Sequence, residues 1–123
     1  MKTFLFFATF FFTQAVFANL YLTTEYQEAG KPSVVTKHHI FLNKKYLIHY
    51  SKMAYSLLLI KLEKDWGTIE TETFVLDNKA RKHLISGGIA NFNLGKKPII
   101  LEQFARSGKR EFMLKITPDR IAP

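Results

Sequence analysis

The chain has 123 residues, with 18 lysines and arginines against 10 aspartates and glutamates, no cysteine and a formal net charge of +8. This length is enough for one domain and not for two. The missing cysteine excludes a disulfide scaffold, a cysteine nucleophile and a lipid anchor on an N-terminal cysteine, so the fold must depend on an ordinary apolar core. The excess of positive charge favours association with anionic surfaces.

The first 18 residues have the organisation of a secretory signal peptide. Lys2 gives a positive start, residues 4–12 form an apolar stretch too short to span a bilayer, and Val16-Phe17-Ala18 fits a cleavage region. We predict a signal peptide over residues 1–18 and an exported mature chain over 19–123, with a charge of +7 because only Lys2 is lost. Export without cysteine favours a bacterial source and a periplasmic or secreted location. No later apolar run approaches the roughly 20 residues of a membrane-spanning helix, so no transmembrane span is expected after cleavage.

The first half of the mature chain reads as short runs rich in Val, Ile, Thr, Tyr and Phe, which is typical of β-strands. Asn43-Lys44-Lys45 is expected to be a hairpin connection between two of these runs, since asparagine tolerates the left-handed conformation. The run at 55–64 is apolar on both faces in its first half, which favours a central strand of a covered sheet. Strands are expected at 20–27, 33–42, 46–50 and 55–64.

Asp65-Trp66-Gly67 then predicts a tight turn, with Gly67 in the left-handed position, and residues 68–76 alternate as a strand should. Residues 80–86 fit either a strand or a helical turn, and Gly87-Gly88 is expected to interrupt the chain there as a bulge or a sheet crossing. Further strands are expected at 89–94, 99–106 and 110–117. Pro118 is expected to end the last strand and to leave residues 118–123 as a flexible tail.

Seven to eight short strands with turn signals every 8–12 residues predict an all-β fold. We predict an antiparallel β-sandwich that forms a single domain over residues 19–117, with a small open barrel as the alternative.

A basic and aromatic cluster is the first candidate site. If successive turns alternate between the two ends of the sheets, three of them share one end, and a tryptophan among cations there would suit a protein partner or an anionic surface component. The alternative is that the tryptophan folds back on the sandwich and the charges are only solvated. The predicted partner-binding residues are Trp66, Lys44, Lys45, Arg106, Lys109 and Arg110.

The strand histidines are the alternative site, for copper or zinc. If the second and third strands form a hairpin, either His38 or His39 comes within reach of His49. A third ligand would be needed, and His83 is the only other histidine. The competing interpretation is a set of half-exposed strand histidines without a metal.

Catalysis finds little support, because no activated nucleophile or acid–base constellation is visible, and a small hydrolase is only a second alternative. Exposed strand edges are the last candidate, either as sites where a partner adds a strand or as edges guarded by Lys37, Lys61 and Lys115. The sequence therefore predicts an exported, non-catalytic binding module that contacts an envelope protein or an anionic surface component. It predicts neither a cofactor nor a nucleic-acid partner.

Overall fold

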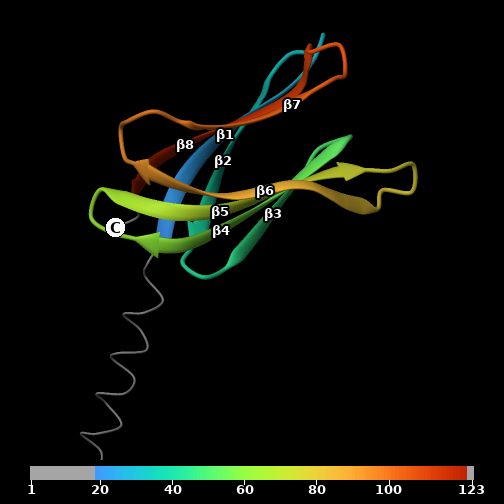
Figure 1. The fold of residues 1–123 in the computed structure, drawn as a ribbon. Coiled ribbons are helices and arrows are strands. Elements are labelled where there is room, and N and C mark those ends of the chain that lie inside the picture. Colours follow the sequence, from blue (N-terminus) through green and yellow to red (C-terminus); the bar gives the residue numbers. More distant parts are fainter. Residues whose placement is uncertain (1–18, 122–123) are drawn as a thin grey trace, which may run out of the picture.

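A computed structural model describes residues 19–121 of the chain (Figure 1). The predicted signal peptide at 1–18 and the last two residues of the predicted tail lie outside the described residues. Eight strands follow one another along the chain: β1 (Asn19–Glu28), β2 (Val34–Phe41), β3 (Lys45–His49), β4 (Met53–Leu62), β5 (Trp66–Leu76), β6 (Lys82–Asn93), β7 (Ile99–Phe104) and β8 (Arg110–Ile121). The described part contains no helix long and apolar enough to cross a membrane.

The strands form two antiparallel sheets packed face to face, which confirms the predicted β-sandwich (Figure 1). The β1 sheet has the order β2-β1-β8-β7, and the β4 sheet has the order β3-β4-β5-β6. Neither sheet closes on itself, so the barrel alternative is wrong. The edge strands are β2 and β7 in one sheet and β3 and β6 in the other.

The core lies between the sheets and follows the alternation of the strands. Leu20 and Leu22 of β1 point inward with Leu114 and Ile116 of β8, and β4 supplies a continuous buried stretch from Met53 to Leu57. The predicted central position of this strand is confirmed, since β4 lies between β3 and β5.

The predicted hairpin at Asn43-Lys44-Lys45 is wrong, because this segment carries the chain from one sheet to the other. β2 pairs with β1, whereas β3 pairs with β4. Asn43 does adopt the expected left-handed conformation, at φ 61°, and its backbone N–H donates to the carbonyl of Leu59 on β4 (2.8 Å). A turn that fits a hairpin locally also fits a crossing between sheets, because the difference lies in distant pairing.

The two glycine predictions are wrong for opposite reasons. Gly67 lies inside β5 without a positive φ, and a Cβ there would meet the Phe92 ring at 2.6 Å and the Lys61 carbonyl oxygen at 2.7 Å. Close packing therefore requires this glycine, while the turn itself is at 63–65. Gly87-Gly88 does not interrupt the chain, because both residues lie within β6 and pair with Glu72 and Thr71 of β5. The register shift of this strand lies just before them, where Ser86 pairs with Thr73 but Leu84 with Phe74, so Ile85 is the extra residue.

The prediction of a flexible tail is wrong for residues 118–121, because β8 continues through Pro118 to Ile121. Pro118 pairs with Leu22 at a register shift. On the other side of β8, the pairing with β7 begins only at Ile116. The missing N–H of the proline therefore costs no ladder hydrogen bond on that side.

Candidate functional site

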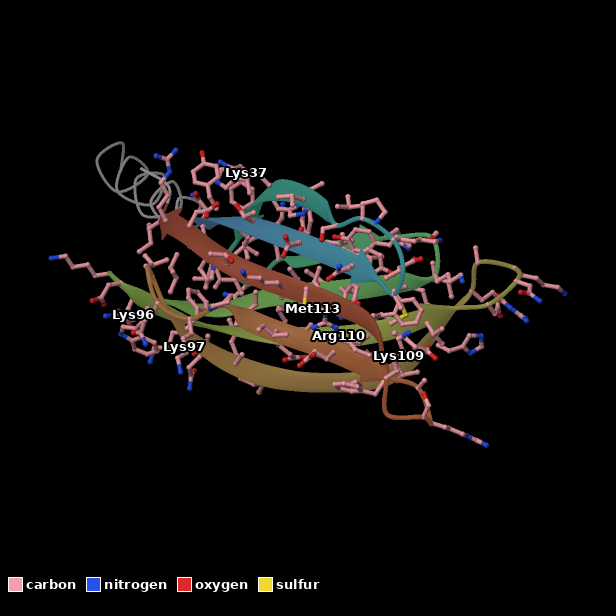
Figure 2. The ribbon with its side chains drawn as sticks, turned by 90° about the horizontal axis from the view of Figure 1, so that it is seen from above. Lys37, Lys96, Lys97, Lys109, Arg110 and Met113 are labelled. Atoms are coloured by element: carbon pink, nitrogen blue, oxygen red, sulfur yellow. The ribbon has the colours of Figure 1, made fainter. Side chains whose placement is uncertain are left out.

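The predicted basic and aromatic cluster is divided between the two ends of the sandwich. Lys44, Lys45 and Trp66 lie at the end formed by the connections 42–44, 63–65 and 94–98, which we call the Trp66 end. The predicted members of the far end are Arg106, Lys109 and Arg110, beside the hairpin between β7 and β8. Figure 2 shows this separation, with Lys96 and Lys97 at one end and Lys109 and Arg110 at the other.

The continuity of β6 is the physical reason for this division. A break at Gly87-Gly88 would have added a turn and returned the last hairpin to the Trp66 end. Because β6 runs unbroken to Asn93 at the Trp66 end, β7 begins at this end and the hairpin that follows it lies at the other.

The Trp66 end carries more positive charge than the sequence analysis assigned to it. Lys96 and Lys97 of the crossing loop join it, and the Lys61 ammonium lies 4.9 Å from the centre of the Trp66 ring. The Trp66 side chain is half-buried. Lys45 forms an ion pair with Glu72 (3.3 Å). Five lysines of this end form no ion pair with a described residue: Lys44, Lys61, Lys64, Lys96 and Lys97.

The histidines proposed for a metal lie on different sheets and on different faces. His38 points inward from β2, where its Nε2 lies 2.9 Å from the hydroxyl of Thr24 and its Nδ1 lies 3.0 Å from that of Tyr46. Burial lowers the pKa of His38 below its usual 6.5. His39 stacks on Tyr21 outside the sheet, and His49 lies on β3. Within residues 19–121 no three histidine or acidic side chains are placed to hold a metal ion.

A buried carboxylate that the sequence analysis missed lies at the far end, at the close of β1. Glu28 is 7 % exposed, and its carboxylate accepts hydrogen bonds from the hydroxyls of Tyr26 and Ser51, both at 2.9 Å. Its other oxygen lies 2.9 Å from the Lys31 ammonium, which, with those hydroxyls, holds the pKa of Glu28 below 4.5. The Tyr50 ring stacks on Tyr26 at 3.8 Å. The hydroxyls of Tyr50 and Tyr55, whose rings lie against Tyr26, are buried and have no hydrogen-bond partner among the described residues. The contacts to Glu28 stabilise the end of β1.

Three of the four edge strands are short or charged, as edges that avoid pairing usually are. β2 carries Lys37 at its middle, β7 has six residues and contains Glu102, and β3 has five residues and begins with Lys45. Of the three predicted guards only Lys37 lies on an edge, since Lys61 and Lys115 belong to the interior strands β4 and β8.

The fourth edge, β6, has twelve residues and no charged side chain from Leu84 to Asn93. It pairs with β5 on one side, and the described residues offer no strand on the other. The eight residues from Lys82 to Ile89 are all exposed, so neither face of this half is covered by the β1 sheet. Ile89 is 67 % exposed and Leu84 is 59 % exposed.

The end of this projecting half is fixed by one aspartate in the turn between β5 and β6. Asp77 accepts hydrogen bonds from the backbone N–H groups of Lys79 and Arg81 and from the side chains of Arg81 and His83, all within 2.9 Å. His83 first, and then the Arg81 backbone, lower the pKa of Asp77 well below its usual range. The exposed half of β6 is therefore a defined strand with an ordered turn, as a pairing surface requires.

Comparisons with protein-family models, with curated proteins and with solved structures give no match to this chain. The site must therefore be judged on its own chemistry.

Proposed function

We propose that this chain is an exported, non-catalytic binding module of a bacterial envelope, and that it captures an extended segment of a partner protein by strand addition to β6. The single observation that carries the proposal is the outer edge of β6 from Ser86 to Asn93, which carries no charged side chain and pairs with no other described strand. Alternate residues of that edge direct backbone N–H and C=O groups away from β5, where a partner strand would bond to them.

The side chains of β6 support the same function. Leu84, Ile85 and Ile89 expose apolar area on the projecting half, which would become buried against an added strand. Large apolar side chains exposed together are typical of interaction surfaces, whereas isolated ones need no explanation. Here they lie in the uncharged stretch of β6 from Leu84 to Asn93, so the backbone and the side chains both favour binding of a partner by strand addition.

A charge placed on the edge tests the proposal. Ile89→Lys adds a guard at a position that is 67 % exposed, so it should leave the fold intact and abolish capture of the partner from an envelope extract. Val35→Lys is the matched control, since Val35 is 60 % exposed on β2, an edge that already carries Lys37. A cross-linker at position 89 should also join the captured protein. Equal capture by both variants, or cross-links from position 35 only, would reject β6 as the contact.

A second candidate function is binding to an anionic surface component through the Trp66 end. The five lysines without an ion pair there favour it, because unpaired cations beside an aromatic ring suit anionic headgroups. Trp66 is the only tryptophan, so its fluorescence reports this end directly. Phosphatidylglycerol vesicles should shift the emission to the blue and phosphatidylcholine vesicles should not. Lys96→Glu with Lys97→Glu should reduce the shift, and an unchanged shift in that variant would reject this candidate.

A further inference from the structure

We infer that the strand which pairs with β6 has an apolar centre with one bulky side chain opposite Gly88, and acidic side chains at both of its ends. This inference rests on the proposed function and names the chemistry of the partner at the same edge.

The charges around β6 are arranged as two positive ends with an uncharged middle. Lys79 and Lys82 stand at the beginning of the strand, and Lys96 and Lys97 follow its end. None of the four forms an ion pair with another residue in 19–121. Arg81 is already paired with Asp77 (2.8 Å) and adds little. The Lys82 ammonium lies 5.2 Å from the centre of the Phe74 ring, a contact that leaves its charge uncompensated. A strand of matching length would meet cations without a carboxylate partner at both of its ends.

The carboxylates near β6 reinforce this pattern. Glu70 of β5 pairs with Ile89, so its negative charge lies beside the middle of the strand. Glu72 pairs with Gly87, but its carboxylate already forms an ion pair with Lys45 (3.3 Å) and adds less. An acidic residue at the centre of a partner would meet them, whereas one at either end would meet lysine. Glu63 and Asp65 lie in the turn next to the Lys96 loop and offset the nearby Lys61 and Lys64, so Lys96 and Lys97 supply the excess positive charge of that end.

The middle of β6 also has room for a large side chain. A Cβ at Gly88 would find no atom within 4 Å, and Gly88 has no positive φ, so packing does not explain the glycine. On the same face of β6, Ser86 is exposed and Ala90 is half-buried. A bulky apolar residue of an added strand would cover the bare backbone at this position, as aromatic side chains do beside edge glycines.

A second copy of this chain does not fit the same edge. Antiparallel pairing of two β6 strands about Gly87-Gly88 would bring Lys79 and Lys82 of each copy beside Lys96 and Lys97 of the other. Parallel pairing would place identical lysines together. Asp65 and Asp77 lie near these ends, but Asp77 is already paired with Arg81 and the lysines outnumber the carboxylates. Repulsion between like charges therefore disfavours both arrangements, so a partner of opposite charge fits better than self-association.

Designed peptides test this chemistry on the protein expressed from its full chain. The probe has twelve residues, the length of β6, with glutamates at both ends, alternating Val and Thr, and one central Phe. One control peptide has lysines in place of the glutamates, and another has Ala in place of the Phe. We expect the glutamate peptide to bind and to slow amide exchange on β6, the lysine peptide to bind at least about tenfold more weakly, and added salt to reduce the difference.

Two variants complete the experiment. Lys96→Glu with Lys97→Glu should weaken binding of the glutamate peptide and strengthen binding of the lysine peptide. Lys37→Glu with Lys115→Glu makes an equal change of charge on the β1 sheet and should leave the affinity for both peptides unchanged. Gly88→Val should cancel the advantage of Phe over Ala. Equal binding of acidic and basic peptides on β6 would overturn the inferred chemistry and leave the proposed function standing. Failure of every peptide, or dimers cross-linked through β6, would also overturn the inference, while the Ile89→Lys capture test decides the proposed function separately.

Discussion

Gly67 and Gly88 should respond to the same substitution with opposite signs. A Cβ at Gly67 would lie 2.6 Å from Cζ of Phe92 and 2.7 Å from the backbone oxygen of Lys61. Contacts between carbon atoms are favourable at about 3.5–4.0 Å, so both neighbours would have to move by roughly an ångström. Phe92 is 3 % exposed within the core, and the oxygen belongs to the backbone of β4. Displacing either of them would therefore cost free energy of folding.

The expected magnitude follows from two opposing effects. Overpacking costs about 1–3 kcal/mol, whereas replacing glycine by alanine restricts the unfolded chain and returns about 0.4–1 kcal/mol. Gly67→Ala should therefore destabilise the fold by about 1–2 kcal/mol, which lowers Tm by roughly 5–15 °C for a domain of this size. Gly88→Ala meets no neighbour and should stabilise by about 0.4–1 kcal/mol.

Urea and thermal unfolding of both variants, followed by circular dichroism, measure this contrast. The midpoints should move in opposite directions while the urea m-value stays constant. If Gly67→Ala were as stable as Gly88→Ala, the close approach of β4, β5 and Phe92 would be wrong, and with it the register of the β4 sheet.

Three further predictions concern titratable side chains. Burial holds the pKa of His38 below 6.5, so unfolding takes up a proton and the stability should fall as the pH drops below 6.5. His38→Gln should flatten this fall in Tm between pH 7 and 5, with His49→Gln as the control. A slope equal to that of the wild type would contradict the prediction. Glu28→Gln should lower the free energy of unfolding, measured in urea at pH 7, by about 1–3 kcal/mol. This difference from the wild type should shrink as the pH falls below 4.5, because the Glu28 carboxylate of the wild type then loses its ionic contacts. A difference that stays constant with pH would refute the assigned partners of Glu28. Asp77→Ala should speed amide exchange in the turn between β5 and β6 without lowering the global Tm; unchanged exchange would show that Asp77 does not order the turn.

The strands were predictable because side-chain alternation is a local signal. Ile40 of β2 is buried between the exposed His39 and Phe41, as alternation requires, and the apolar run of β4 lies on an interior strand of its sheet. These features depend on which residues lie two apart, so a single sequence carries them.

The arrangement of the strands was not predictable in the same way. Asn43 takes the conformation of a hairpin residue while the chain crosses between sheets, and Gly87-Gly88 lies in a strand where glycine usually marks an interruption. Both outcomes are decided by pairing with strands far away in the sequence. The divided basic cluster follows from the second error, since one turn fewer moves the last hairpin to the other end.

The edge of β6 was only partly visible in the sequence. An uncharged run from Leu84 to Asn93 can be read directly, but only the topology shows that it belongs to an edge strand. The proposed guards Lys61 and Lys115 illustrate the same limit, because strand lysines look alike whether they lie on an edge or on an interior strand.

Amide hydrogen exchange of the protein with its captured partner tests the central claim most directly. Strand addition predicts that the amides of β6 which face away from β5, between Leu84 and Asn93, become strongly protected while those of β2, β3 and β7 stay as they were. Protection at another edge or at the Trp66 end, with β6 exchanging as fast as in the free protein, would contradict it.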